Sequence, residues 1–243
     1  ELIRSRHELQ TGGRGRLILG HELLGEVVSF SPGSRLKPGD LVTALVRRPC
    51  PDPACGPCRA GETDFCVTGR FAERGISLAD GFLTEYVAEE ERYLVRVPED
   101  LAGIGVLIEP QSVLEKAVTL LRTTHARTGH KPRAALVLGA GPLGVLAALT
   151  CRSLGWETDV YSLEAPDRHG PRLIAEAGCA YLQAKPGEPL SALGKEWDVI
   201  LECTGSPSLA AAAVGALKYN GVLAVIGVAA AAEPIPVPAA ALM

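Results

Sequence analysis

The residues Arg133–Leu154 read RAALVLGAGPLGVLAALTCRSL, and this stretch decides the fold. Ala134–Leu138 is a short apolar run of the kind found in a strand buried on both faces. Gly139–Gly144 follows directly and matches G-x-G-x-x-G, and Val145–Leu154 continues with the apolar spacing of a helix. Because a strand and a helix flank the glycine motif, the stretch predicts that the chain binds a dinucleotide.

The three glycines of this motif have separate physical roles. Gly139 permits the tight turn, Gly141 lets the backbone approach a pyrophosphate, and Gly144 lets the helix pack closely on the sheet. The free N–H groups at the start of the helix then bind the diphosphate. A purely structural turn is the alternative, since glycine-rich turns are common.

Composition excludes several classes of protein. The chain of 243 residues is 47% hydrophobic and 21% charged, the balance of a globular protein with one large or two modest domains. Its net charge of −4 argues against a nucleic acid or a membrane surface as partner, and no apolar run is long enough to span a membrane. The chain does not begin with Met, and residue 1 has the character of mid-sequence, so we expect a fragment.

The first half of the chain predicts an irregular β-rich domain. Short strand-like runs occur at Glu26–Phe30, Leu41–Val46 and Phe82–Val87, and the turn Lys37–Asp40 separates two of them. This pattern is typical of a small barrel-like domain with long loops. A helical segment around Ser112–Arg127 connects it to the second half.

Four of the seven cysteines are clustered with the spacing C-x4-C-x2-C-x7-C, at Cys50, Cys55, Cys58 and Cys66. Four thiolates on one compact loop satisfy tetrahedral Zn²⁺ and leave no open position, so the spacing predicts a structural zinc site. Free thiols or two disulfides are the alternatives. A metal cluster in a nucleotide-binding protein favours a reducing compartment, and we expect a cytoplasmic location. The scattered Cys151, Cys179 and Cys203 are expected to pack as small apolar residues.

A second group of metal-binding side chains is less specific. His21 and Glu22 lie side by side before a glycine, and Glu109 ends an apolar run. A His-Glu pair is commonly a surface couple, and an acid in the position of Glu109 is commonly a helix cap. The spacing alone leaves these interpretations and a metal site equally open.

Taken in order, these motifs resemble the zinc-dependent medium-chain alcohol dehydrogenases. Gly-His-Glu-x-x-Gly at 20–25 is followed by the cysteine loop, by Gly-Val-Leu-x-Glu-Pro at 105–110 and by the glycine motif. Several stretches are similar to the glucose (aldose) 1-dehydrogenase branch: Val46–Pro49, Glu73–Ile76, Asp80–Phe82 with Glu85–Tyr86, and Gly105–Lys116. The resemblance implies a fold of β and α/β parts, with a GroES-like β-barrel catalytic domain at 1–118 and a doubly wound Rossmann domain at 119–243.

The resemblance also implies a catalytic zinc, with His21 and Glu109 as direct ligands and Glu22 as a ligand or a group that alternates with water. In the family, a further cysteine ligand precedes a segment similar to Glu1–Leu2, and the Rossmann domain continues past a segment similar to Ala229–Met243. We therefore expect both ends to be missing and the chain alone to be inactive.

One departure from the family concerns the cysteine loop. The family usually separates the first two cysteines by two residues, whereas four separate Cys50 from Cys55. Pro51–Ala54 must therefore bulge, or Cys50 does not ligate the metal.

The second strand of the Rossmann domain is expected at Glu157–Ser162, and the residues after its end bear on the cofactor. Glu164 favours NAD, because an acid there binds the adenosine ribose, whereas Arg168 and Arg172 keep NADP open. A solvated turn residue is the equal alternative for Glu164. Two further strands are expected, one at Asp198–Gly205 that ends in a turn and one at Gly221–Gly227 that ends in glycine. The predicted cofactor-binding residues are Gly139, Gly141, Pro142, Leu143, Gly144, Ser162, Glu164, Thr204, Gly205, Gly227 and Val228.

The resemblance implies a zinc-dependent oxidoreductase that transfers hydride from a hydroxyl of a sugar or alcohol to NAD or NADP. Zinc would lower the pKa of that hydroxyl, and an aldose would yield a lactone. A polyol, a secondary alcohol or threonine is the alternative substrate, and a non-catalytic nucleotide-binding zinc protein is the alternative class. Relatives are commonly homodimers or homotetramers.

Overall fold

The computed structural model describes residues 16–185 and 188–228. It divides the chain into two compact units, Glu1–Pro110 and Gln111–Met243. The expected truncations at Glu1–Leu2 and Ala229–Met243 lie outside the described residues. Among the helices that are described, none has the length and apolar character that crossing a membrane requires.

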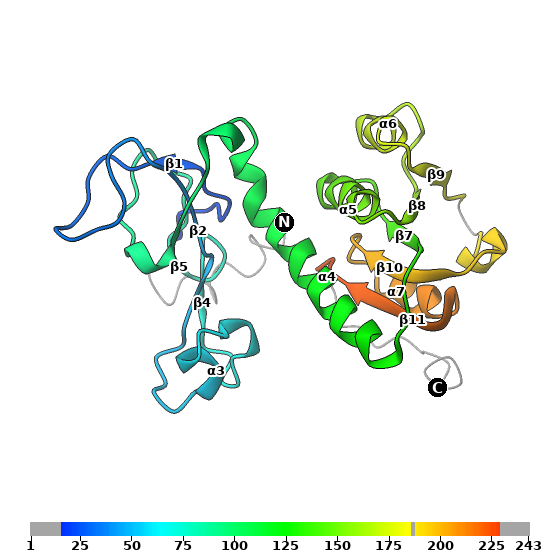
Figure 1. The fold of residues 1–243 in the computed structure, drawn as a ribbon, viewed down its shortest axis with the longest axis horizontal. Coiled ribbons are helices and arrows are strands. Elements are labelled where there is room, and N and C mark those ends of the chain that lie inside the picture. Colours follow the sequence, from blue (N-terminus) through cyan, green and yellow to red (C-terminus); the bar gives the residue numbers. More distant parts are fainter. Residues whose placement is uncertain (1–15, 186–187, 229–243) are drawn as a thin grey trace. The chain divides into compact units, whose positions relative to one another are not determined.

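The second unit is built on a five-stranded sheet in which each described pair of neighbours is parallel (Figure 1). The strand order is β11-β10-β7-β8-β9. The strands are β7 (Ala134–Leu138), β8 (Glu157–Ser162), β9 (Ala180–Gln183), β10 (Trp197–Glu202) and β11 (Leu217–Val225). The chain starts in the middle of the sheet at β7 and reverses direction across it after β9, which is the order of a doubly wound fold.

Burial on both faces explains why the central strands are apolar throughout. Leu136 packs with Trp197 and Ile200 on one face of the sheet, whereas Val137 packs with Leu201 on the other. Successive side chains of a strand point to opposite faces, so a strand covered on both sides needs a continuous apolar run. The predicted strands Ala134–Leu138 and Glu157–Ser162 have the bounds of β7 and β8.

Helices cover both faces of this sheet. Residues of α4 (Ile108–Thr128), α5 (Pro142–Ser153) and α6 (His169–Glu176) join the core on one face, and α7 (Pro207–Val214) joins the core on the other with the 3₁₀ turn Leu190–Leu193. The predicted helix at Ser112–Arg127 is α4, which runs continuously across the boundary between the two units. The parallel sheet with helices on both faces confirms the predicted doubly wound α/β fold of the second half.

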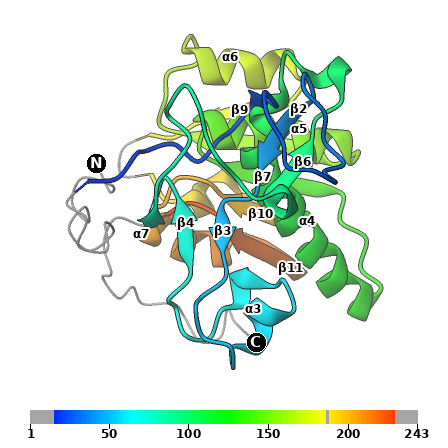
Figure 2. The same ribbon diagram turned by 90° about the vertical axis from the view of Figure 1, so that its left-hand side faces the viewer.

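The first unit contains two small sheets of short strands. One has the order β1-β2-β6 and the other β3-β4-β5. A lobe that carries the short helix α3 extends from the ends of β3 and β4 (Figure 2). The elements are β1 (Gly25–Glu26), β2 (Leu41–Ala44), β3 (Arg47–Arg48), α3 (Gly56–Arg59), β4 (Ala72–Arg74), β5 (Leu78–Ala79) and β6 (Leu94–Arg96), with 3₁₀ turns at Thr63–Phe65, Glu91–Tyr93, Glu99–Leu101 and Gly105–Leu107.

The strand predicted at Phe82–Val87 is wrong. The amide of Phe82 donates to the carbonyl of Gly20 at 2.8 Å, and that of Leu83 donates to Leu19 at 2.9 Å, but no ladder continues from them. The backbone turns at Thr84, whose amide donates to the carbonyl of Phe82. Leu83 and Tyr86 are about three-quarters exposed. The alternation of apolar and polar residues in this run therefore does not correspond to one buried face.

Leu136 is fully buried at the centre of the sheet, so its truncation tests the stability of the Rossmann core. We expect Leu136→Ala to lower the free energy of unfolding by about 2–5 kcal/mol, because it removes apolar contacts and leaves a cavity. Urea unfolding followed by tryptophan fluorescence measures this. Leu120→Ala, at a half-exposed position of α4, is the control and should change stability by about 0.5 kcal/mol or less. Equal effects of the two substitutions would contradict the burial of Leu136 in the core.

Candidate functional site

The four predicted cysteines come together in the lobe that carries α3. One ligand atom from each of Cys50, Cys55, Cys58 and Cys66 lies within 4.8 Å of the others, and all four are free thiols. Asp52 explains how the longer first spacing is accommodated. Its carboxylate accepts from the amide of Ala54 at 2.9 Å, and its carbonyl accepts from the amide of Cys55 at 3.2 Å. This tight turn bulges Pro51–Ala54 and brings Cys50 to the other sulfurs.

The dimensions and chemistry of this cluster fit a tetrahedral zinc ion. A Zn–S bond of about 2.3 Å requires sulfurs about 3.8 Å apart, and the Sγ atoms of Cys55 and Cys66 are 4.0 Å apart. Without a cation the thiols cannot all ionise. The hydrogen bond with Thr68 lowers the pKa of Cys66 to about 6. A backbone hydrogen bond lowers the pKa of Cys58, but burial and the other thiols outweigh it and raise that pKa to about 12.

His21, Glu22 and Glu109 form the second cluster, with ligand atoms within 4.8 Å of one another. Nε2 of His21 lies 3.9 Å from Oε2 of Glu109. Burial raises the pKa of the Glu109 carboxyl, the charge of Glu22 raises it further, and His21 acts in the opposite direction. A cation at this point would reverse that balance, because it stabilises the ionised carboxylates. The sequence could not choose between a helix cap and a metal site at Glu109, whereas the structure brings all three side chains together.

Backbone contacts hold His21 in this position. Gly20 has a left-handed φ of +90°. Its carbonyl oxygen lies so close to Gly75 that a Cβ on residue 75 would be 2.1 Å from this oxygen. Three residues after His21, the side chain of Leu24 packs on Gly105, where a Cβ would lie 2.9 Å from Cδ1 of the leucine. Gly105 begins the 3₁₀ turn that leads directly to Glu109, so the segments that carry His21 and Glu109 are fixed to each other.

The predicted cofactor-binding residues gather at the carboxyl edge of the five-stranded sheet. Leu138 at the end of β7 pairs with Tyr161 of β8 and with Glu202 of β10, and Glu202 pairs in turn with Val225 of β11. The turns after these strands therefore lie next to one another. They carry Gly139 and Gly141 after β7, Glu164 after β8, Thr204 and Gly205 after β10, and Gly227 and Val228 after β11, while Ser162 is the last residue of β8 and Gly144 lies in the first turn of α5.

The glycine turn after β7 brings the start of α5 close to the end of that strand. Gly139 adopts φ +107°, and a Cβ on Gly144 would lie 2.1 Å from the Gly139 carbonyl oxygen. Gly141 is the N-cap of α5 and offers no side-chain acceptor, and Pro142 and Leu143 begin the helix. The first N–H groups of α5 are therefore available to an anion.

Glu202 is a residue at this edge that the sequence did not single out. It is fully buried, and its carboxylate accepts hydrogen bonds from the amide of Thr204 at 2.6 Å, from the Thr204 hydroxyl and from the amide of Gly205 at 3.1 Å. Its carbonyl accepts from the amide of Gly227 at 2.9 Å. Glu202 thus holds together the turns after β10 and β11. The sequence signal that could have identified Glu202 is an acidic residue at the end of a buried apolar strand.

Glu164 is exposed beyond the end of β8. Its Oε2 would lie 3.6 Å from a Cβ on Gly170, so the carboxylate faces the first turn of α6. Its carbonyl accepts from the Tyr181 hydroxyl at 2.5 Å, which fixes the backbone of this turn. Arg168 is the N-cap of α6, and Arg172 follows in its first turn. The structure therefore places an acid and two cationic residues around one turn.

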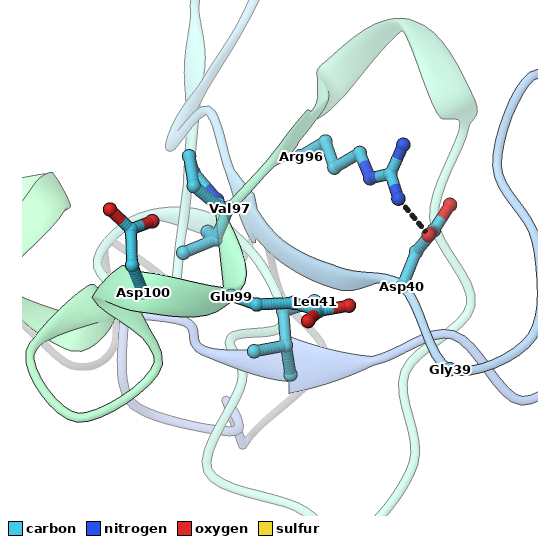
Figure 3. A pocket seen from close by; sticks show the side chains of 8 residues that line it. Gly39, Asp40, Leu41, Arg96, Val97, Glu99 and Asp100 are labelled. Carbon is cyan, nitrogen blue, oxygen red and sulfur yellow. Dashed lines mark ion pairs between the residues drawn. The ribbon is translucent and has the colours of Figure 1, made fainter.

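A cavity of about 310 Å³ in the first unit is separate from these clusters (Figure 3). Arg96 and Asp40 form an ion pair of 2.8 Å in its wall, and the other charged lining residues, Glu99 and Asp100, are acidic. None of the predicted site residues lines it. It lies between the ends of β2 and β6 and has no part in the candidate site.

A β-domain with a cysteine lobe, followed by a dinucleotide-binding sheet, defines the class of zinc-dependent alcohol dehydrogenases. Residues 3–99 match the model of the alcohol dehydrogenase GroES-like domain, and residues 102–242 match that of the glucose dehydrogenase C-terminus. The chain belongs to the glucose dehydrogenase family.

Individual relatives agree with this assignment. The glucose 1-dehydrogenase of Methanocella arvoryzae is 38% identical over 218 residues, which cover 88% of this chain and 60% of the relative. Glucose 1-dehydrogenase 2 of Vulcanisaeta moutnovskia is 37% identical, over 94% of this chain and 63% of its own length. The Haloferax mediterranei glucose dehydrogenase, solved with NADP, Zn and gluconolactone, has a TM-score of 0.82 at 34% identity, over 98% of this chain and 69% of that one. The chain thus spans about three-fifths of the length of the first two.

The opposite pKa shifts of two thiols predict unequal reactivity in the metal-free protein. At neutral pH Cys66 is mainly thiolate and Cys58 is a thiol, so we expect iodoacetamide to alkylate Cys66 much faster. The rate at Cys66 should fall as the pH drops through about 6. Timed alkylation followed by peptide mass spectrometry measures both rates.

Thr68→Val is the matched variant, because it removes the hydrogen bond that lowers the pKa of Cys66. We expect it to slow alkylation of Cys66 at neutral pH and to leave Cys58 unchanged. Equal labelling of Cys58 and Cys66 in the original chain would show that the two pKa values are not shifted in opposite directions.

Proposed function

We propose that this chain is part of a zinc-dependent oxidoreductase that transfers a hydride from the C1 hydroxyl of an aldose such as glucose to NAD⁺ or NADP⁺. The observation that carries the proposal is the convergence of His21, Glu22 and Glu109, from distant parts of the sequence, in a chain whose other unit has a phosphate-binding glycine turn. The similarity to glucose 1-dehydrogenases supports an aldose as the substrate.

The two clusters take different roles in this proposal. Cys50, Cys55, Cys58 and Cys66 hold a structural zinc, since four thiolates leave no position for a substrate. His21 and Glu109 are direct ligands of a catalytic zinc, and Glu22 is a ligand or alternates with water. Zinc held there would supply Lewis acidity toward the substrate hydroxyl, and a bound nicotinamide would supply the hydride acceptor. The 3.9 Å between His21 and Glu109 is close to the roughly 3.4 Å of adjacent ligands in a tetrahedral site.

Residues of the chain bind and orient the cofactor. The first N–H groups of α5 donate to the diphosphate, for which Gly139, Gly141 and Gly144 leave space. Glu202 keeps the turn at Thr204 and Gly205 rigid, so that this turn and the one at Gly227 and Val228 form a fixed wall for the nicotinamide half. Ser162 and Glu164 face the adenosine ribose, while Pro142 and Leu143 start the helix beside the diphosphate.

The clustered thiols support a cytoplasmic location, because a reducing compartment keeps them available to metal. We also propose that the protein acts as a homodimer or homotetramer.

Turnover in the presence and absence of zinc tests the function. We expect a polypeptide that carries this sequence and is extended to the length of the relatives to reduce NAD⁺ or NADP⁺ with glucose, and to stop when a chelator removes zinc. His21→Asn should lower kcat/KM by more than the roughly 10–100-fold that accompanies loss of a group that only orients a ligand. It should also remove one zinc per chain, as measured by elemental analysis.

Glu176→Gln, an exposed residue at the far end of α6 and outside both clusters, is the control and should leave zinc content and turnover unchanged. Activity on a polyol or simple alcohol but not on glucose would show that the substrate is not an aldose, while the proposed zinc-dependent hydride transfer would stand. Metal-independent turnover, or full zinc content after His21→Asn, would refute the catalytic site.

Glu164 predicts a preference that binding measurements on this chain can test. A carboxylate beside the adenosine ribose binds its hydroxyls and repels a 2′-phosphate. We expect Glu164→Gln to shift the ratio of dissociation constants toward NADP⁺ by about tenfold, or about 1.4 kcal/mol. Glu176→Gln, at the other end of α6, is the control and should not shift it. If Glu164→Gln leaves the ratio of the two dissociation constants unchanged, Glu164 does not contact the cofactor and interacts only with the first turn of α6.

A further inference from the structure

A cavity of about 250 Å³ lies in the second unit, beside the amino ends of two neighbouring strands. Its walls come from the last turns of α4 and from the residues that lead into β7 and β8. Because β7 and β8 are parallel, their amino ends share one edge of the sheet, and Gly139 and Ser162 lie at the opposite edge. The cavity is therefore separate from the candidate cofactor site.

His125 is the unusual residue of this cavity. It lines the space and is 3% exposed, yet neither ring nitrogen makes a hydrogen bond with any of the described residues. The backbone of Asn220 interacts with the ring and raises the pKa of His125, but it lies outside the distance and angle limits of a hydrogen bond. Burial and the neighbouring His130 lower the pKa of His125, which keeps the ring neutral. A neutral imidazole offers one donor and one acceptor, and buried polar atoms nearly always have partners.

The neighbouring His130 is anchored and does not supply that partner. Its ring centroid lies 5.0 Å from that of His125, and its Nε2 lies 3.1 Å from Oδ1 of Asp198. Asp198 also accepts from the amides of Arg133 and Ala134, at 3.0 and 2.9 Å, and pairs with Nζ of Lys218 at 3.3 Å. This carboxylate is thus occupied by the start of β7 and by Lys218, and although its charge acts on His125, its oxygens do not bond to that ring.

The remaining lining residues indicate the ligand chemistry. Arg122 and Lys131 contribute two cationic side chains, and no acidic residue is among the described residues that line the space. Leu121, Leu154 and Trp156 provide apolar surface beside them. Cations favour an anionic group, whereas apolar walls favour a hydrocarbon or aromatic body over an inorganic ion.

We propose that this cavity binds a small organic carboxylate with an apolar body. The carboxylate lies between Arg122 and Lys131, the apolar body packs on Trp156, and a polar atom of the ligand completes the hydrogen bonds of His125. The site does not depend on the proposed activity, because none of these residues belongs to the metal or cofactor clusters.

Benzoate, an aromatic carboxylate, is the probe. We expect it to bind the protein saturably in a calorimetric titration and to shift the NMR signals of the His125 ring. Arg122→Gln and Lys131→Gln should each weaken binding by about tenfold, because each removes a charge-assisted hydrogen bond. Both residues are exposed, so these variants retain the fold. Arg127→Gln, an exposed arginine of α4 outside the cavity, is the matched control and should bind benzoate unchanged.

Two comparisons test the ligand chemistry and the location. Benzamide, the neutral analogue, and inorganic phosphate should each bind more weakly than benzoate, and saturating NADP⁺ should leave benzoate binding intact. The proposal is overturned if benzoate binding does not saturate or if NADP⁺ displaces benzoate. It is also overturned if phosphate binds as tightly as benzoate, or if the Arg127 variant loses as much affinity for benzoate as the Arg122 variant.

Discussion

The backbone contact between Gly139 and Gly144 is the constraint on which the candidate cofactor site depends. A Cβ on residue 144 would lie 2.1 Å from the Gly139 carbonyl oxygen, a separation that atoms do not adopt. The contact lets α5 start directly at the end of β7, with its first N–H groups at the carboxyl edge of the sheet. The turns after β8, β10 and β11 meet at the same edge because their strands are parallel and in register with β7.

Close packing of the same kind positions the candidate metal ligands His21 and Glu109 in the first unit. The close approach of Gly20 and Gly75 fixes the backbone before His21, and the contact of Leu24 with Gly105 fixes the turn before Glu109. The cysteine lobe differs, because its geometry comes from one tight turn at Asp52 and from the thiols themselves. One cluster is therefore organised by packing between distant segments, and the other by a local loop.

This difference explains which features could be predicted from the sequence. The bounds of β7 and β8 followed from continuous apolar runs, and the cysteine cluster followed from spacing, since both are local signals. The proximity of His21 and Glu109 depends on long-range packing that no local pattern encodes, so residue spacing left it open. The strand expected at Phe82–Val87 failed because its alternation is not matched by burial. Glu202 was overlooked because its role is to hold two turns whose proximity appears only in the folded sheet.

The local character of the cysteine lobe bears on biosynthesis. Its four thiols lie between Cys50 and Cys66, whereas the sheet is complete only when β11, near the end of the described chain, has pairing contacts with β10. Domains nearer the amino terminus fold first as a chain leaves the ribosome, and local contacts form before distant ones. If the lobe binds zinc as proposed, its four thiols can meet the metal while the sheet is still being translated. Metal supply at that moment, before release, would govern how much of the chain reaches its native state.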